Sequence, residues 1–420
     1  MAVPQAVSWG MKDLELYQQL LGLVEPWHVK QVTLNREERS VEVEVVCAET
    51  VWGCPQCQRR MHVHEWERRR WRHLDSCQFQ TILVADVPRV LCEKHGTQVV
   101  GVPWAEPYSR FTRQLERLAI DVMLECSIRG ACEILGLSWD EADGIKQRAV
   151  ARGLARKPQR VMPRLCVDEK SMGVGQQYMT IVAAVTETGA ARVDYVGEAR
   201  TRASLDAFWE QLTAEPLAGV EAVAMDMWEP YRLSTLAHVP KAADKIAHDP
   251  YHLVRYMNHA VNEVRKAEHR TLREAGDDRL TGSRYTWLYG WDHLPEAKAA
   301  ELQTLSRQRL QTARAWRLKE AFRWFLWLGD REGAAGYFRA WYGWALRSRL
   351  EPVKKVARMF QRHLPRILNF FDHRLSNGPI EGLNNRIQGL IKKAFGYRNK
   401  ERFKTDVLFH LGGLDLYPAQ

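Results

Sequence analysis

The chain has 420 residues, of which 45% are hydrophobic and 27% are charged, so it can bury a sizeable core and is not a disordered protein. Its 61 lysines and arginines exceed its 51 acidic residues by ten, which indicates a polyanionic partner. No segment approaches the roughly 18 consecutive apolar residues of a membrane-spanning helix, and the N-terminus lacks the pattern of a signal peptide. We therefore expect an intracellular protein of two or three domains with no membrane partner.

The first concentration of positive charge lies in residues 59–72, after an acidic stretch. Arginines there alternate with Trp66 and Trp71, an arrangement typical of surfaces that bind the phosphates of a nucleic acid. The same run also fits a solvated pair of strands with a basic exposed face. On the first interpretation, the contacts come from Arg68, Arg69, Arg70 and Arg72.

Two short motifs flank this basic run. Cys54-Pro-Gln-Cys57 and Cys92-Glu-Lys-His95 each place two metal-binding residues at the spacing of a zinc knuckle, separated by a segment long enough for two or three short strands. Because structural Zn²⁺ takes four sulfur or imidazole ligands, the pairs predict a zinc ribbon, with ordinary turn cysteines as the alternative. We expect this module to span residues 1–105.

Residues 106–157 have the hydrophobic periodicity of helices. The pattern predicts a helix from residue 111, a turn at Gly136, and another helix that begins with a capping box over residues 138–141. This outline fits a helix-turn-helix and equally a plain helical hairpin. Because the second helix opens with acidic residues, nucleic-acid contacts are expected only from its later turns, at Lys146 and Arg148.

A new domain is expected to start near residue 161, after a linker rich in basic residues and proline. Its pattern is strand, strand, strand, helix, strand, with Asp168 at the end of the first strand and Asp226 at the end of the last. This is the order of the ribonuclease H fold, in which those strands are neighbours and their acidic residues converge. Paired carboxylates favour Mg²⁺ or Mn²⁺, and two such ions support phosphoryl transfer.

A third carboxylate lies much further along the chain. Pro379 and the apolar spacing that follows predict a helix with Glu381 in its first turn and Asn385 one turn later. A glutamate at this position also favours the helix dipole and needs no metal for that. The helix and the segment after it are basic, and we expect DNA-binding contacts from Arg386, Lys392, Lys393 and Arg398.

Several segments together resemble the bacterial insertion-sequence transposases of the ISL-three family, which are DDE enzymes. The segments are RRWRHLD, CEKHG, VPWAEPYSRFT, Asp168 after its strand, MDMWEPY around Asp226, HDPYH, and SNGPIEGLNNRIQGLIKKAFGYRN around Glu381. The resemblance covers roughly residues 40 to 415. It implies a zinc-binding module, a helix-turn-helix and a ribonuclease H-like domain interrupted by an insertion, with Asp168, Asp226 and Glu381 in the places of the three catalytic acids.

The spacing of these acids agrees with an insertion, since 155 residues separate Asp226 from Glu381 (381 − 226). We expect a multidomain α+β protein in which residues 161–252 and 371–415 form the ribonuclease H-like α/β catalytic domain. Residues 253–370 lack convincing strands and are expected to form an all-helical insertion domain. Its tryptophans suit either core packing or stacking on an unpaired base.

The motif at residues 249–252 has two compatible interpretations. Asp249 before a proline is a good N-cap for a helix, which is sufficient reason for the motif. Asp-x-x-His also occurs near the active centre of other DDE transposases, where His252 could meet a phosphate. Asp249, His252 and Asn385 are therefore possible supports of the active site.

The resemblance implies a DNA transposase that binds terminal inverted repeats and catalyses strand cleavage and strand transfer by two-metal chemistry. It further implies Mg²⁺ or Mn²⁺ in the catalytic site, double-stranded DNA as partner, a homodimer on DNA and a location in the bacterial cytoplasm at the nucleoid. The alternative is a non-catalytic, sequence-specific DNA-binding regulator derived from a transposase.

Overall fold

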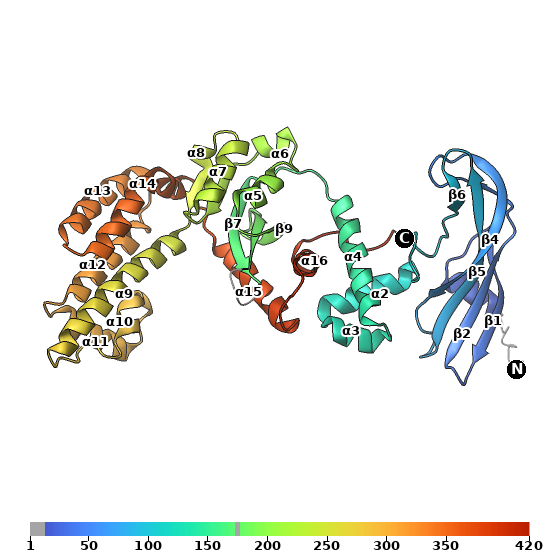
Figure 1. Cartoon of the computed structure of the whole chain (residues 1–420), viewed down its shortest axis with the longest axis horizontal. Helices are drawn as coiled ribbons and strands as arrows, with labels where there is room; N and C mark the ends of the chain where they lie inside the picture. The colour runs from blue at the N-terminus through green and yellow to red at the C-terminus, as the bar shows by residue number, and fades with distance from the viewer. Residues whose placement is uncertain (1–12, 173–176, 420) are drawn as a thin grey trace, which may run out of the picture. The chain divides into compact units, whose positions relative to one another are not determined.

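A computed structural model describes residues 13–172 and 177–419 of the chain (Figure 1). The chain divides into two compact units, one formed by residues up to 157 together with those from 414 onward, and the other by residues 158–413. Within the described ranges, no helix is long and apolar enough to cross a membrane.

The first unit begins with helix α1 (Asp13–Leu20) and a six-stranded sheet of order β1-β2-β5-β4-β3, with β6 also paired to β5. Two antiparallel strands of 13 residues each connect the cysteine motifs, so the strands are longer than the short ones expected. Trp27, Trp71 and Trp104 pack edge to face in the core on one side of the sheet. The strands are β1 (Trp27–Asn35), β2 (Ser40–Cys47), β3 (Val51–Gly53), β4 (Arg60–Arg72), β5 (Gln80–Cys92) and β6 (Gly96–Val99).

Three helices follow in the same unit: α2 (Arg113–Glu125), α3 (Ile128–Leu135) and α4 (Trp139–Ala155). Each begins at a hydroxyl residue whose side chain accepts a backbone N–H, and Ser138 with Glu141 forms the predicted capping box. Gly136 ends α3 with φ +62°, a left-handed conformation that glycine adopts without strain. The predicted turn between α3 and α4 is therefore confirmed.

The second unit contains a five-stranded mixed sheet of order β11-β10-β7-β8-β9. Strands β7, β8 and β9 form an antiparallel meander, and β10 and β11 run parallel to β7, after the helices α5 and α6. The predicted order of strand, strand, strand, helix, strand is confirmed. The elements are β7 (Arg164–Ser171), β8 (Tyr178–Val185), β9 (Ala191–Glu198), α5 (Arg202–Trp209), α6 (Ala214–Ala218), β10 (Ala222–Met225), α7 (Glu229–His238), α8 (Ala242–Lys245) and β11 (Ile246–His248).

Residues 250–373 are helical, as expected for the insertion, and the chain then returns to the sheet through α15 and α16 (Figure 1). Four phenylalanines at the centre of this helical core are fully buried. The elements are α9 (Pro250–Glu274), α10 (Arg284–Leu288), a 3-10 turn (Trp291–His293), α11 (Glu296–Ser306), α12 (Gln311–Phe325), α13 (Arg331–Arg347), α14 (Glu351–His373), α15 (Gly378–Lys393) and α16 (Lys400–Leu411).

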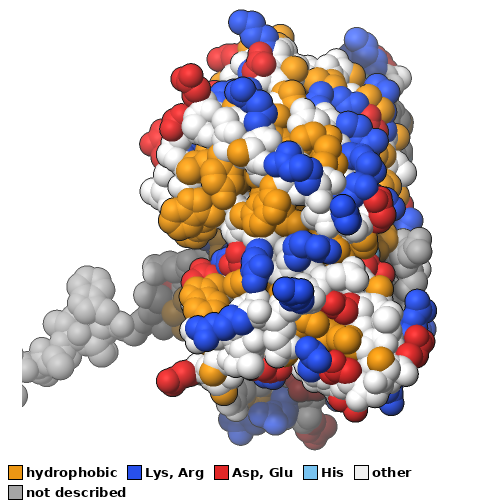
Figure 2. Space-filling view, turned by 90° about the vertical axis from the view of Figure 1, so that its left-hand side faces the viewer, with side chains coloured by type: hydrophobic (Ala, Val, Ile, Leu, Met, Phe, Trp, Pro, Cys, Tyr) orange, Lys and Arg blue, Asp and Glu red, His pale blue; other side chains and the backbone are white. Residues whose placement is uncertain are grey.

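The tryptophans of the helical segment divide into two groups. Trp287 and Trp341 are buried in its core, whereas Trp324 and Trp327 are 65% and 76% exposed. Figure 2 shows the end of the molecule at the left of Figure 1, where hydrophobic side chains lie in patches between lysines and arginines. Core packing therefore explains only part of the tryptophan content.

Candidate functional site

The four predicted zinc ligands, Cys54, Cys57, Cys92 and His95, lie together at the end of the long strands β4 and β5. Cys57 Sγ lies 3.7 Å from Cys92 Sγ, and His95 Nδ1 lies 3.6 Å from Cys54 Sγ and 3.5 Å from Cys92 Sγ. A tetrahedron with Zn–S bonds of about 2.3 Å has edges of roughly 3.7 Å between sulfurs. The backbone amide of Lys94, directed at Cys92 Sγ, lowers the pKa of that thiol. The cluster fits structural zinc.

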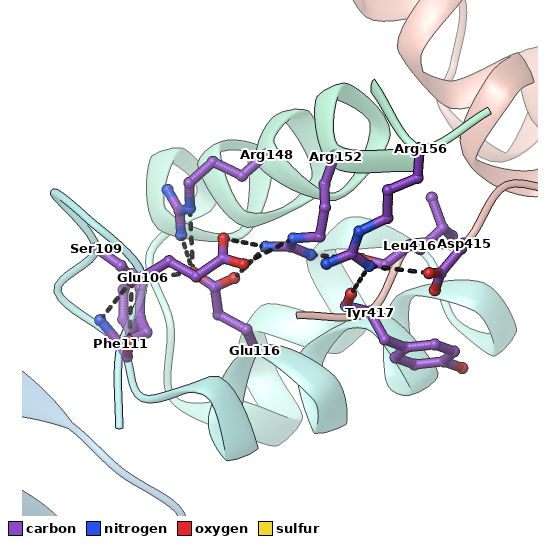
Figure 3. A network of polar contacts seen from close by, with 10 residues as sticks. All are labelled: Glu106, Ser109, Phe111, Glu116, Arg148, Arg152, Arg156, Asp415, Leu416 and Tyr417. Atoms are coloured by element: carbon purple, nitrogen blue, oxygen red, sulfur yellow. Dashed lines mark hydrogen bonds and ion pairs between the residues drawn. The ribbon is translucent and has the colours of Figure 1, made fainter. Parts of the chain in front are cut away.

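The basic face of α4 is turned into the protein rather than toward solvent (Figure 3). Glu116 of α2 is 1% exposed, and its carboxylate accepts hydrogen bonds from Arg148, Arg152 and Ser109. Lys146 is also buried, at 5% exposure. Lys146 is thus buried and Arg148 bonds to Glu116 within the fold of the unit, and their predicted contact with DNA stays a prediction.

The C-terminal residues complete this network. Arg152 donates to the carbonyl oxygen of Leu416, and Arg156 donates to the carbonyl oxygen of Tyr417 and to the carboxylate of Asp415 (Figure 3). The Tyr417 hydroxyl donates to Asp121 Oδ1 over 2.6 Å. The exposed positions of α4 that remain, among them Asp140, Gln147 and Ala151, carry no positive charge.

The arginines of β4 are largely paired with acids on neighbouring strands. Arg70 lies 2.8 Å from Glu42, and Arg68 lies 3.6 Å from both Glu44 and Asp86. Arg72 is 11% exposed and pairs with Asp75, and Arg69 lies over the Trp71 ring, which is itself buried. This surface is thus closer to a solvated sheet face of mixed charge than to the free basic surface expected from the arginine run.

Asp168 and Asp226 lie on neighbouring parallel strands. Strand β10 pairs with β7 so that Met225 faces Val167, and each aspartate is the next residue along its strand direction. Asp226 directly follows β10, as predicted, but β7 continues three residues beyond Asp168 because Asp168, Glu169, Lys170 and Ser171 pair with β8. Asp168 is therefore inside its strand and not at its end, and the two aspartates each follow one residue of the same Val167–Met225 pair.

The Asp168 carboxyl is partly buried without a cation beside it. Burial, together with the negative charge of Glu169, raises its pKa from 3.8 to about 6. Asn384 Nδ2 of α15 donates to Asp168 Oδ2 over 2.7 Å, and the Glu169 amide donates to Oδ1 over 2.9 Å. The amide oxygen of Asn384 is buried and accepts no hydrogen bond from the described residues. This oxygen beside a carboxylate suits a hard cation.

The motif at residues 249–252 caps a helix and also contacts Asp226 and the start of α15. Asp249 is 1% exposed, caps α9 by accepting from the His252 amide, and accepts from the Asn377 amide over 2.8 Å. His252 Nδ1 lies 3.4 Å from Asp226 Oδ2. Asp249 therefore joins the start of α9 to the start of α15, while His252 contacts the second aspartate.

Glu381 lies in the first turn of α15, as predicted, but its side chain is exposed. Among the described residues, only the zinc cluster brings three or more ligand groups within 4.8 Å of one another, so Glu381 does not join the aspartates at that spacing. Asn385 is also exposed, and its neighbour Asn384 makes the contact with Asp168. The sequence analysis missed Asn384 and Asn377, and the adjacent asparagines 384 and 385 were the only available signal.

The cations predicted after Glu381 have a different setting from those of α4 and β4. Arg386, Lys392, Lys393 and Arg398 are all exposed, on α15 and the segment that follows it. The last turn of α15 therefore presents a basic surface to solvent within the second unit.

Comparisons with known proteins agree with this arrangement. A family model described as a transposase matches residues 165–407. A model for the zinc finger of the IS204/IS1001/IS1096/IS1165 transposases matches residues 50–95, and a model for the helix-turn-helix domain of transposase family ISL3 matches residues 101–150.

Two curated relatives extend over most of the chain. The transposase for insertion sequence element IS1557 of Mycobacterium tuberculosis is 26% identical over 439 residues, covering 96% of each protein. The transposase for insertion sequence element IS1001 of Bordetella parapertussis is 27% identical over 372 residues, covering 87% of this chain and 90% of the relative. With the transposase model alone spanning more than half of its residues, the chain belongs to the ISL3 family of DDE transposases.

Proposed function

We propose that this transposase binds the terminal inverted repeats of an insertion sequence and catalyses metal-dependent DNA strand cleavage and strand transfer. The observation that carries the proposal is the adjacency of Asp168 and Asp226 on the paired strands β7 and β10, inside the segment that matches the transposase family. Carboxylates on neighbouring strands are the arrangement that two-metal phosphoryl transfer requires.

In this proposal Asp168, Asp226 and Glu381 hold Mg²⁺ or Mn²⁺, which would activate the attacking oxygen and stabilise the leaving 3′-oxygen. The donor set fits such ions, because its donors are hard oxygens and no described cation lies within 4.0 Å of Asp168. His252 orients Asp226, and Asp249 anchors the start of α15 through the Asn377 amide. Glu381, in the first turn of α15, would supply the third carboxylate.

The remaining surfaces would hold the DNA. We assign the zinc ribbon of residues 1–105 and the helix-turn-helix of residues 106–157 to the recognition of the inverted repeat, and the exposed cations after Glu381 to the backbone. The catalytic domain would comprise residues 161–252 and 371–415, interrupted by the insertion of residues 253–370. Because two element ends must be joined, at least a homodimer is expected on DNA, in the bacterial cytoplasm at the nucleoid.

A cleavage assay tests the proposal. The substrate is a duplex that carries the inverted repeat found in the DNA beside the gene, and wild type is compared with Asp226→Asn at saturating Mg²⁺. Loss of a metal-binding carboxylate is expected to reduce cleavage by roughly a thousandfold, or about 4 kcal/mol. Asp278→Asn, an exposed aspartate of the helical segment, is the matched control and should cleave like wild type. Equal cleavage by Asp226→Asn would contradict the assignment.

The exposed position of Glu381 favours one other candidate function, a DNA-binding regulator with an inert catalytic domain. Such a protein would bind the inverted repeat in a sequence-specific manner and would not cleave it in Mg²⁺, Mn²⁺ or any other divalent ion. A gel-shift experiment and a cleavage time course on the same duplex separate the two functions.

A further inference from the structure

A groove with a volume of about 710 Å³ lies between α9 and α14 in the second unit. Tyr256 and His259 of α9 form one wall, and Lys355, Arg358 and Arg362 of α14 belong to the other. Val356, Met359 and Ala260 give the groove an apolar lining between the walls. It is thus an apolar channel with a row of cations along one helix.

The acidic residues of the groove are already paired. Glu263 forms an ion pair with Lys266 over 3.0 Å, and Glu351 forms one with Lys354, each pair one turn apart on its own helix. These partners lower the pKa of both carboxyls. In contrast, Lys355, Arg358 and Arg362 are exposed, and no described acid lies within ion-pair distance of them. The groove therefore carries more positive than negative charge.

The groove starts beside the candidate catalytic residues. His252, which contacts Asp226, is in the first turn of α9, and Tyr256 follows one turn later. The groove lining therefore begins one helical turn after the histidine that contacts Asp226.

We propose that the α9–α14 groove binds the phosphate backbone of the DNA strand that leads away from the reacting phosphate. The inference rests on the proposed function and adds a substrate-binding surface to it. Lys355 and Arg362 are seven residues apart, or about 10 Å along a helix. That length is about three times the rise of roughly 3.4 Å per phosphate of one strand along the axis of a DNA duplex. Tyr256 and Met359 would contact the sugars and bases of the strand.

The test compares two triple variants of the full chain that remove the same charge. Lys355→Gln/Arg358→Gln/Arg362→Gln neutralises the groove, whereas Arg270→Gln/Arg309→Gln/Arg314→Gln neutralises three exposed cations elsewhere on the helical segment. Affinity for the labelled inverted-repeat duplex with its flanking DNA is measured in EDTA at several salt concentrations. The groove variant should lose about three units of the slope of log K against log salt, and the control variant should keep the wild-type slope.

Ethylation interference then locates the contact. Wild type should be sensitive to ethylation of phosphates beside the element end, and the groove variant should lose this sensitivity at the same positions. Equal slopes for the two variants, or interference that the groove variant retains, would overturn the proposal. If the triple variant does not fold, Arg358→Gln alone should lose about one unit of slope.

These measurements do not depend on cleavage. Wild type that fails to cleave in any divalent ion would contradict the proposed function and leave the result for the groove intact. If wild type cleaves and the groove variant binds DNA with the wild-type salt dependence, only the proposed role of the groove is contradicted.

Discussion

Two carboxylates that are largely buried, Glu116 in the first unit and Asp168 in the second, have opposite electrostatic surroundings. Glu116 accepts hydrogen bonds from two arginines and a serine, and Arg152 in turn also binds Glu106 and the carbonyl oxygen of Leu416. Asp168 receives only neutral donors, from Asn384 and a backbone amide. The first charge is neutralised within the chain, and the second is not.

The difference indicates which charges are structural and which are available for function. A buried ion pair with both partners present costs little, but a buried carboxylate without a cation is unfavourable for folding. A buried carboxylate without a cation therefore indicates a functional site, and a bound divalent cation would offset its unfavourable burial. The comparison therefore assigns Glu116 to the stability of the helix-turn-helix and supports the proposed role of Asp168 in metal binding, and the three predictions below test it.

The largest expected effect is that of Glu116→Gln. Removing this charge leaves the buried Arg152, whose side chain is 8% exposed, with one acidic partner fewer. The free energy of unfolding of the helices α2 to α4 should therefore fall by about 3 kcal/mol. Hydrogen exchange of peptides from α2 and α4 measures the change locally. The control is Glu133→Gln, which removes an exposed ion pair with Arg129 and should cost about 0.5 kcal/mol or less. Equal losses of stability in the two variants would contradict a structural role for the buried Glu116.

Asp168→Asn should instead increase the free energy of unfolding of the metal-free protein. Because folding raises the pKa of Asp168 from 3.8 to about 6, its contribution to stability is retained below pH 4 and lost as pH rises through 6. The variant should therefore exceed wild type in stability by about 1 to 2 kcal/mol at pH 8, after allowance for partial exposure of the carboxyl. The gain should disappear near pH 4.

Hydrogen exchange of peptides from β7 and β8 at the two pH values checks this prediction. Added Mg²⁺ should reverse the order at pH 8, since it would stabilise wild type and not the variant. A variant that is less stable than wild type at pH 8 without metal would show that Asp168 is compensated in some other way.

The smallest effect is expected for Arg70→Gln on the sheet of the first unit. The Arg70 side chain is 61% exposed and pairs with Glu42, so the change in stability should stay within about 0.5 kcal/mol. DNA affinity should also change little, because this charge is already balanced. Fluorescence anisotropy at physiological salt measures the affinity for DNA. The reciprocal variant Glu42→Gln should raise this affinity slightly. A tenfold loss on Arg70→Gln would mean that Arg70 exchanges Glu42 for a phosphate.

Much of the fold was predictable because its signals are local. Two ligand pairs at knuckle spacing predicted the zinc cluster, Ser138 with Glu141 predicted the start of α4, and Asp249 before Pro250 predicted the start of α9. Apolar periodicity likewise predicted the order of strands and helices around Asp168 and Asp226. Each of these signals depends on residues within a few positions of one another.

The contacts that the sequence did not reveal join residues that are distant in sequence. Lys146 and Arg148 have the composition of DNA-binding residues, yet Arg148 bonds to an acid 32 residues earlier. Asn385 was named because it lies four residues after Glu381, and only the packing of α15 on β7 shows that Asn384 contacts Asp168. A run of arginines likewise does not reveal that Glu42 and Glu44 lie on a neighbouring strand.

By itself the sequence determined the succession of modules, the zinc ligands and the helix caps, since ligand spacing and hydrophobic periodicity are properties of short segments. The tertiary structure alone decided which charges are neutralised, which asparagine holds Asp168 and where a cationic groove remains open between α9 and α14. The physical reason is that an ion pair or a buried hydrogen bond depends on distance in space, and Asn384 reaches a carboxylate 216 residues away.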